Sequence, residues 1–103
     1  MPVVRLSRGR FSPEQFSMVK DALAAGHETL DPALRRLHGL LHYYVSIDAT
    51  TNAMVNVSVW KTGEDANQMN SLKEMLAQRD VFVAMGVNFD PIANYDPVWD
   101  ITP

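Results

Sequence analysis

The segment from Leu40 to Trp60 constrains the fold more than any other part of the sequence, because it is typical of a β-hairpin. Two runs rich in Val, Ile, Tyr and Trp flank residues 48–52, whose Asp, Thr and Asn side chains favour a turn. In the second run, alternation places three valines on one face and a mixed set on the other: Met54, Asn56, Ser58 and Trp60. An aromatic ring beside an amide and a hydroxyl is typical of ligand pockets, so this mixed face is expected to border a pocket.

Four cues predict that a helix begins at Pro13, directly after a first strand over residues 3–11. Ser12 suits the N-cap position, Pro13 suits the first helical position, and Gln15 is placed to complete a capping box. Phe16 follows at the spacing of a hydrophobic staple with the last residue of the strand. The start of this helix is therefore well marked.

The same helix is expected to be long and to be kinked or broken near Pro32. Proline has no N–H group, and its ring clashes with the carbonyl four residues earlier. We expect the helix to end close to Gly39, because glycine readily adopts the left-handed conformation that follows a helix C-terminus.

A second helix is predicted to begin after Thr62, which suits an N-cap and is followed by acidic residues in the first turn. Apolar residues at spacings of three and four continue the helical pattern to residues 77–79. One short turn over residues 81–85 should then be closed by Gly86. The run of residues 87–89 is interpreted as a short last strand.

The predicted order of elements is β-α-β-β-α-β, the ferredoxin-like pattern of an α+β fold with an antiparallel four-stranded sheet. Residues 1–103 make one domain, and residues 90–103, with three prolines and several large apolar side chains, are expected to form a C-terminal arm. Two helices cover only one face of such a sheet, whereas both faces are predicted to be apolar. A second copy of the chain should cover the other face, which gives a homodimeric α+β barrel.

Composition argues against several classes of function. A net charge of -3 makes nucleic acid an unfavourable partner. The absence of cysteine excludes disulfides, thiolate metal sites and cysteine nucleophiles, and the three scattered histidines lack metal-ligand spacing, so we expect no metal and no cofactor. No apolar run reaches the ~20 residues of a membrane span, and no signal-peptide pattern begins the sequence. The sequence therefore predicts a cytoplasmic protein with no membrane partner.

The sequence resembles the antibiotic biosynthesis monooxygenase-like domains of the dimeric α+β barrel superfamily. The resemblance covers residues 1–89 and rests on the element order, on Gly39-Leu40-Leu41 before the second strand, and on a third strand that ends in Trp60. Its best motif is Asn56-x-x-x-Trp60, which looks like the Asn and Trp pair of cofactor-independent members. Arg79 lies where an arginine often accompanies that pair.

The resemblance implies oxidation of a small, phenol-like aromatic substrate by molecular oxygen without a cofactor. It implies catalytic roles for Asn56, Trp60 and Arg79, with an amide, an indole N–H and a guanidinium that hold an anionic substrate. Substrate-binding candidates on the neighbouring strand are His42, Tyr43 and Tyr44. A hairpin loop with an even number of residues would place Tyr43 beside Asn56, and an odd loop would place His42 and Tyr44 there.

Structural interpretations stand beside these functional ones. Trp60 is also typical of core packing, Arg79 of a helix C-terminus, and His42 of a half-buried strand position. Haem-degrading relatives carry an axial histidine after the tryptophan, and no histidine follows His42 here, which disfavours haem. The alternative function is a non-catalytic dimeric barrel that binds a small hydrophobic ligand or serves a stress-related role.

Overall fold

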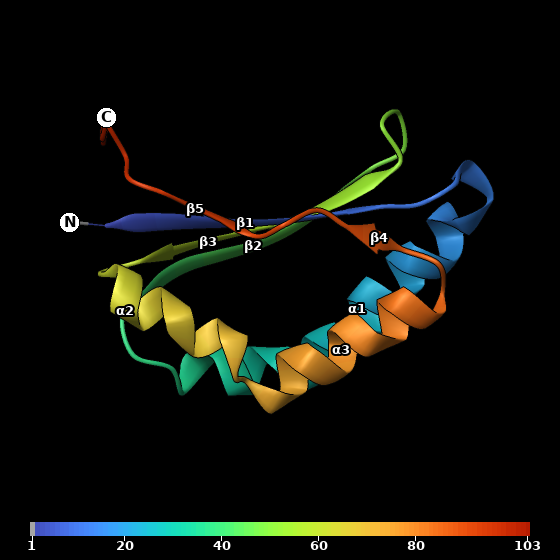
Figure 1. Cartoon of the computed structure of the whole chain (residues 1–103), viewed down its shortest axis with the longest axis horizontal. Helices are drawn as coiled ribbons and strands as arrows, with labels where there is room; N and C mark the ends of the chain where they lie inside the picture. The colour runs from blue at the N-terminus through green and yellow to red at the C-terminus, as the bar shows by residue number, and fades with distance from the viewer. Residues whose placement is uncertain (1) are drawn as a thin grey trace.

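The computed structural model describes residues 2–103 as a curved sheet with helices packed against one of its faces (Figure 1). The strands are β1 (Val3–Arg10), β2 (Leu40–Asp48), β3 (Ala53–Trp60), β4 (Asn88–Phe89) and β5 (Ala93–Tyr95). The helices are η1 (Pro13–Gln15), α1 (Phe16–Arg35), α2 (Gly63–Ala66), η2 (Asn67–Asn70) and α3 (Lys73–Ala84), of which η1 and η2 are short 3₁₀ turns. Within the described residues, none of these helices is both long and apolar enough to cross a membrane.

The sheet has the ferredoxin-like order β2-β3-β1-β4 with antiparallel neighbours, which confirms the predicted fold class. β5 is a further strand inside the segment that was expected to be an arm. It pairs with β1 along Val4–Leu6, on the same edge that β4 joins at Gly9 and Arg10. Beyond β5 the chain rises away from the sheet (Figure 1), and its apolar side chains are the most exposed large ones of the described residues: Val98, Trp99 and Ile101.

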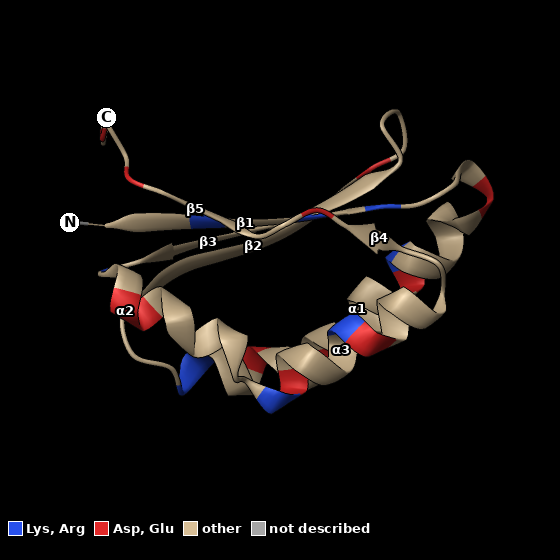
Figure 2. Cartoon of the chain, viewed as in Figure 1, with Lys and Arg blue, Asp and Glu red and all other residues tan. Residues whose placement is uncertain are grey.

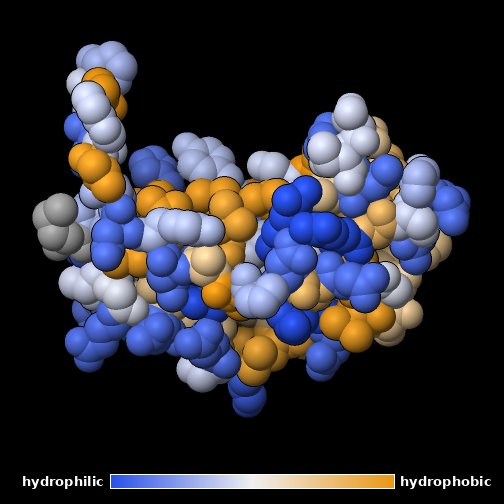
Figure 3. All heavy atoms as spheres, turned by 45° about the horizontal axis from the view of Figure 1, so that its top comes forward, coloured by the Kyte–Doolittle hydropathy of each residue, from blue (hydrophilic) through white to orange (hydrophobic). Residues whose placement is uncertain are grey.

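The outer face of the sheet, opposite the helices, carries an apolar patch, with Arg8 and Arg10 on the same face toward the hairpin end. The register places Val4 beside Val59 and Leu6 beside Val57, and all four side chains remain half-buried in the single chain. Figure 3 shows apolar atoms gathered on this side, between the raised C-terminal tail and the end of the hairpin. A patch of this kind is the usual mark of an interaction surface.

The start of the first helix is as predicted, but Pro32 does not break it. The Ser12 backbone N–H donates to Gln15 Oε1 at 2.9 Å, and the rings of Phe11 and Phe16 lie 6.2 Å apart. α1 then runs through Pro32 to Arg35. The carbonyl that proline leaves without a donor belongs to an exposed turn, where water can satisfy it.

The second helical region differs from its prediction. It consists of three pieces: α2, η2 and α3. The chain leaves the helical conformation at Ser71 and Leu72, between η2 and α3, and α3 then continues without interruption to Ala84. Asn and Ser side chains compete for backbone hydrogen bonds, and Ser71 Oγ donates to the Gln68 carbonyl at 3.4 Å. The predicted ends are nevertheless present, since Thr62 Oγ1 accepts from Asp65 N–H at 3.1 Å and Gly86 adopts a φ of 95°.

The apolar core between sheet and helices is divided into two clusters. One surrounds Trp60 and the other surrounds Phe82. On β3 these clusters hold the two ends of the inner face, Trp60 and Met54, while Asn56 and Ser58 lie between them. The middle of the inner face is therefore polar, and the functional site is to be sought there.

Candidate functional site

A cavity of about 240 Å³ lies between the polar middle of the sheet and the helices. Its sheet side is formed by β1, β2 and β3, and its opposite side by α1, η2 and α3, with a largely apolar lining. The polar side chains that line it are Arg5, Ser7, Tyr43, Asn56, Ser58, Asn70, Gln78 and Arg79. Among the described lining residues there is no Asp or Glu, so the charge of the cavity is positive.

The hairpin register decides which β2 side chain reaches this cavity. Residues 49–52 form the loop, an even number, and Val45 pairs with Asn56 while Tyr43 pairs with Ser58. Tyr43 therefore lies on the inner face with Asn56. His42 and Tyr44 lie on the outer face, where their rings stack 6.0 Å apart.

Arg5 is the buried charge of the cavity, with 6% of its surface exposed. It projects from the middle of β1, a strand that carries basic residues and no acidic ones (Figure 2). Its Nη2 donates to Asn70 Oδ1 at 2.8 Å, and no ion pair of Arg5 is found within the described part of the chain. Burial lowers the pKa of the Arg5 guanidinium, yet arginine stays charged in proteins. A neutral amide is thus the partner of a full positive charge.

The Tyr43 hydroxyl is a protonated donor next to that charge. Burial raises the pKa of Tyr43 to about 12, and the nearby charge of Arg5 and the side chain of Asn56 oppose this shift more weakly. The hydroxyl donates to Met75 Sδ at 4.0 Å, and a thioether is a weak acceptor. Tyr43 can therefore offer its proton to a better acceptor that enters the cavity.

Asn56 has an unused acceptor. Its Oδ1 is buried and has no hydrogen-bond partner among the described residues. Most buried polar groups are paired, and an unpaired one is costly unless a water or ligand completes it. The Asn56 amide is positioned to meet a hydroxyl or another polar group of a bound molecule.

Of the other two residues with an implied catalytic role, Arg79 lines the cavity and Trp60 does not. Arg79 lines the cavity from α3, with its guanidinium carbon 4.8 Å from the centre of the Phe89 ring. Trp60 is fully buried in one core cluster, and its Nε1 donates to Ser58 Oγ at 2.8 Å. Ser58 in turn lines the cavity, so Trp60 reaches the site through that hydroxyl.

The structure thus brings Asn56, Arg79 and Tyr43 to one cavity, with Trp60 behind it, and places His42 and Tyr44 on the other face. The sequence interpretation missed Arg5 and its partner Asn70. The one sequence signal for Arg5 was its position as a charged residue inside a strand, on the same face as the apolar Val3. Only the pairing of that strand with β3 reveals that this face points inward.

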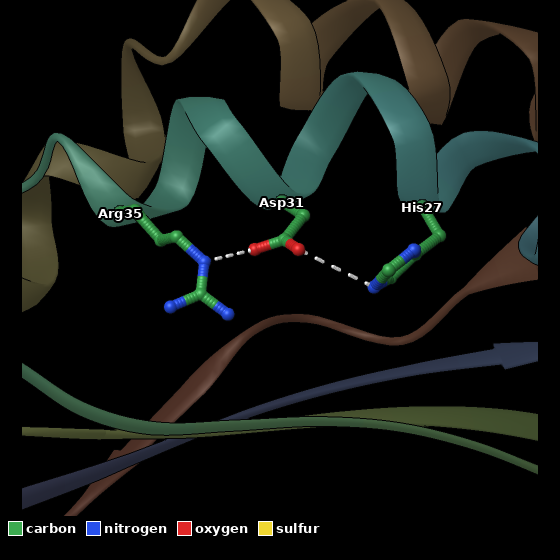
Figure 4. A network of polar contacts seen from close by, with 3 residues as sticks. All are labelled: His27, Asp31 and Arg35. Atoms are coloured by element: carbon green, nitrogen blue, oxygen red, sulfur yellow. Dashed lines mark hydrogen bonds and ion pairs between the residues drawn. The ribbon is translucent and has the colours of Figure 1, made fainter.

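A second, more open groove of about 740 Å³ runs between α1 and the edge strand β2. Figure 4 shows the polar side chains of α1 at this groove, where Asp31 lies between Arg35 and His27, whose Nε2 is 3.6 Å from Asp31 Oδ2. His27 and Arg35 are largely exposed while Asp31 is half-buried, and ion pairs with exposed partners contribute little stability. The smaller cavity is the better candidate site, because it holds the buried polar groups. Within residues 2–103, no group of three or more His, Cys, Asp or Glu side chains could hold a metal ion.

Fold and cavity together define the class of protein: a ferredoxin-like α+β domain with a cationic, mainly apolar cavity between sheet and helices. A provisionally named antibiotic biosynthesis monooxygenase from Deinococcus radiodurans has the same fold, with a TM-score of 0.74 and 18% sequence identity over 98% of this chain and 97% of that one. SnoaB of Streptomyces nogalater, a cofactor-independent oxygenase, has a TM-score of 0.68 and 13% identity over 99% of this chain and 98% of that one. These similarities confirm the predicted likeness in fold to antibiotic biosynthesis monooxygenases. No family model matches the chain, and no curated protein matches it significantly.

Proposed function

We propose that this protein is a cofactor-independent monooxygenase that oxidises a small, phenol-like aromatic with molecular oxygen. The observation that carries the proposal is the meeting of Asn56, Arg79 and Tyr43 with the buried Arg5 in one mainly apolar cavity. The fold shared with SnoaB, which is itself a cofactor-independent oxygenase, supports the same activity.

The chemistry requires the substrate to become an anion. The phenolate passes one electron to O₂, and the resulting superoxide joins the ring radical to form a C–O bond. The peroxide anion formed in this way takes up a proton from water, equal to the one that the phenol released, and becomes a hydroperoxide. Loss of water from this hydroperoxide breaks the O–O bond, removes the ring hydrogen and leaves a carbonyl, so that phenol and O₂ give a quinone and one water. The two guanidinium groups stabilise the anion and superoxide, and apolar walls exclude competing water.

Each polar residue then has a distinct role. Arg5 and Arg79 lower the pKa of the bound phenol by their charge, while the Asn56 Nδ2 donates a hydrogen bond to the phenolate oxygen and so fixes the reacting ring. Tyr43 keeps its own proton, because its pKa is raised to about 12, and donates a hydrogen bond to a substrate oxygen. Trp60 positions Ser58 through the hydrogen bond that its Nε1 donates.

We infer in addition that the protein acts as a homodimer in which a second copy covers the outer face of the sheet. The apolar, half-buried positions around Val57 support this assembly. The helices of the single chain pack on the opposite face only (Figure 1).

The proposal is tested with an oxygen electrode, purified protein and a set of phenols and polycyclic hydroxyarenes, with no cofactor added. Asn56→Ala should lower turnover by roughly 10² to 10³, the loss typical of one preorganised donor to a developing anion. Asn67→Ala removes an exposed asparagine of η2 and should leave turnover unchanged. Oxygen consumption that does not differ between these two variants would refute the assigned role of Asn56.

A ligand-binding protein without turnover is the second candidate. It is favoured by the absence of Asp, Glu and His from the described lining residues, which leaves the cavity without an evident base. Saturable binding of a phenol without oxygen uptake would select this function over the oxygenase.

A further inference from the structure

Arg5 is a charge that the chain itself does not neutralise. The side chain is 94% buried, since 6% of its surface is exposed, and Asn70 Oδ1 is the one side-chain acceptor found for it within residues 2–103. A guanidinium has five N–H donors. Because Arg5 lines the cavity, its remaining donors can be met by a bound molecule.

The surroundings of Arg5 select an anion. The only charged side chains that line the described part of the cavity are Arg5 and Arg79, and both are cationic. Buried charges in proteins are normally paired. A ligand with negative charge supplies the missing partner, and a carboxylate matches the fork of a guanidinium with two parallel hydrogen bonds.

Tyr43 adds a neutral donor beside the same charge. Its hydroxyl donates to the Met75 sulfur, a weak acceptor, at 4.0 Å, and can turn to an oxygen held by Arg5. The rest of the lining suits an aromatic ring, because the polarizable methionines Met54, Met69 and Met75 border the cavity. The volume of about 240 Å³ is below the ~300–1,000 Å³ usual for drug-sized ligands, which limits the ligand to one or two rings.

We propose that the ligand of this cavity is a small aromatic acid, whose anionic group is bound by Arg5 and the Tyr43 hydroxyl while its ring lies among the methionines. This inference rests on the proposed function in taking the cavity as the substrate site, and it adds the substrate class. It makes Arg5 a specificity-determining residue that acts on binding whether or not oxidation follows.

The test measures binding of a matched pair of probes, 1-hydroxy-2-naphthoate and 1-naphthol, by titration calorimetry at neutral pH. One charge-assisted interaction is worth about 1.5–3 kcal/mol, so the carboxylate should bind about tenfold to a hundredfold more tightly than the naphthol. Arg5→Gln should remove most of this difference and leave naphthol binding within about threefold. Arg10→Gln is the matched control on the same strand, because Arg10 is exposed and pairs with Asp90 at 3.2 Å. Equal affinities for the two probes, no binding of either, or a preference that survives in Arg5→Gln would overturn the proposal.

The stability of a second variant separates a binding role from a structural one. Arg5→Met removes a buried charge that lacks a charged partner, so the melting temperature without ligand should be unchanged or higher. A clear fall would show that Arg5 is there to hold the fold and would overturn the binding role. If the naphthoate binds through Arg5 without oxygen uptake, this inference stands and the oxygenase proposal fails. If neutral phenols are oxidised but 1-hydroxy-2-naphthoate binds no more tightly than 1-naphthol, the oxygenase proposal stands and this inference fails.

Discussion

Replacing Tyr43 by Phe should change how the stability of the protein depends on pH in the alkaline range. Burial raises the pKa of Tyr43 from 10.0 to about 12, so the folded state holds this proton more tightly than the unfolded state does. The resulting stabilisation is complete below pH 10 and is lost as the pH rises through the folded pKa of about 12.

The size of the effect follows from the shift. Two pKa units, from 10.0 to about 12, correspond to about 2.7 kcal/mol of unfolding free energy at about 1.36 kcal/mol per unit. Tyr43→Phe has no proton to lose and should keep this part of its stability. At pH 8 the substitution should cost less than about 1 kcal/mol, because the hydroxyl donates to a weak acceptor, the Met75 sulfur, at 4.0 Å.

The assay is urea denaturation followed by circular dichroism from pH 8 to pH 12, at one protein concentration for every sample. By pH 12, where the folded tyrosine is half-ionised, the wild type should have lost about 2.3 kcal/mol more than Tyr43→Phe. Asn67→Ala is the control, because Asn67 is exposed on η2 and carries no titratable group, so its replacement should leave the wild-type pH dependence unchanged. Parallel losses in the wild type and Tyr43→Phe would refute the argument from burial.

Two further substitutions test the assembly and the role of the buried indole. Val57→Asp should convert the proposed dimer to a monomer in sedimentation experiments at micromolar concentration, because an unpaired charge buried at the proposed interface is costly. Val81→Asp is the control and should leave the dimer intact, because Val81 is exposed on α3. A dimer that survives Val57→Asp would contradict pairing through the outer face. Trp60→Phe removes the donor to Ser58 Oγ and should lower the free energy of unfolding by about 1–3 kcal/mol in thermal denaturation. It should lower turnover less than Asn56→Ala does, and a greater loss of turnover would mean that the indole acts on the substrate directly.

The fold could be predicted because its strand order depends on local patterns. The alternation in the hairpin and the cues around Pro13 are each contained in a few neighbouring residues. The break at Ser71 was missed because apolar residues continue at helical spacing across it, so periodicity does not register the interruption. Pro32 was expected to kink or break α1. The helix is unbroken, because one lost hydrogen bond on an exposed turn does not outweigh the packing of the turns on either side.

The candidate site could be predicted only in part. Asn56 was identifiable because an amide inside a strand is uncommon. Tyr43 was predicted only as one of three candidates with His42 and Tyr44, because the choice depends on a loop length that the structure supplies. Arg5 could not be identified in this way, because an arginine in a strand is usually a surface residue. Its burial results from β1 lying at the centre of the sheet beneath the helices, which depends on contacts far apart in the sequence.

The even length of the hairpin loop has a consequence for insertions and deletions. Residues 49–52 lie at the far end of the hairpin from Trp60, are exposed or half-buried, and would ordinarily tolerate changes in length. A deletion of one residue would shift the pairing of β2 by one position, so Tyr43 would turn outward and Tyr44 would turn into the cavity. Removal or addition of two residues would preserve the face of every side chain. Homologous chains that keep this cavity should therefore vary the loop in steps of two residues, although no residue of the loop touches the cavity.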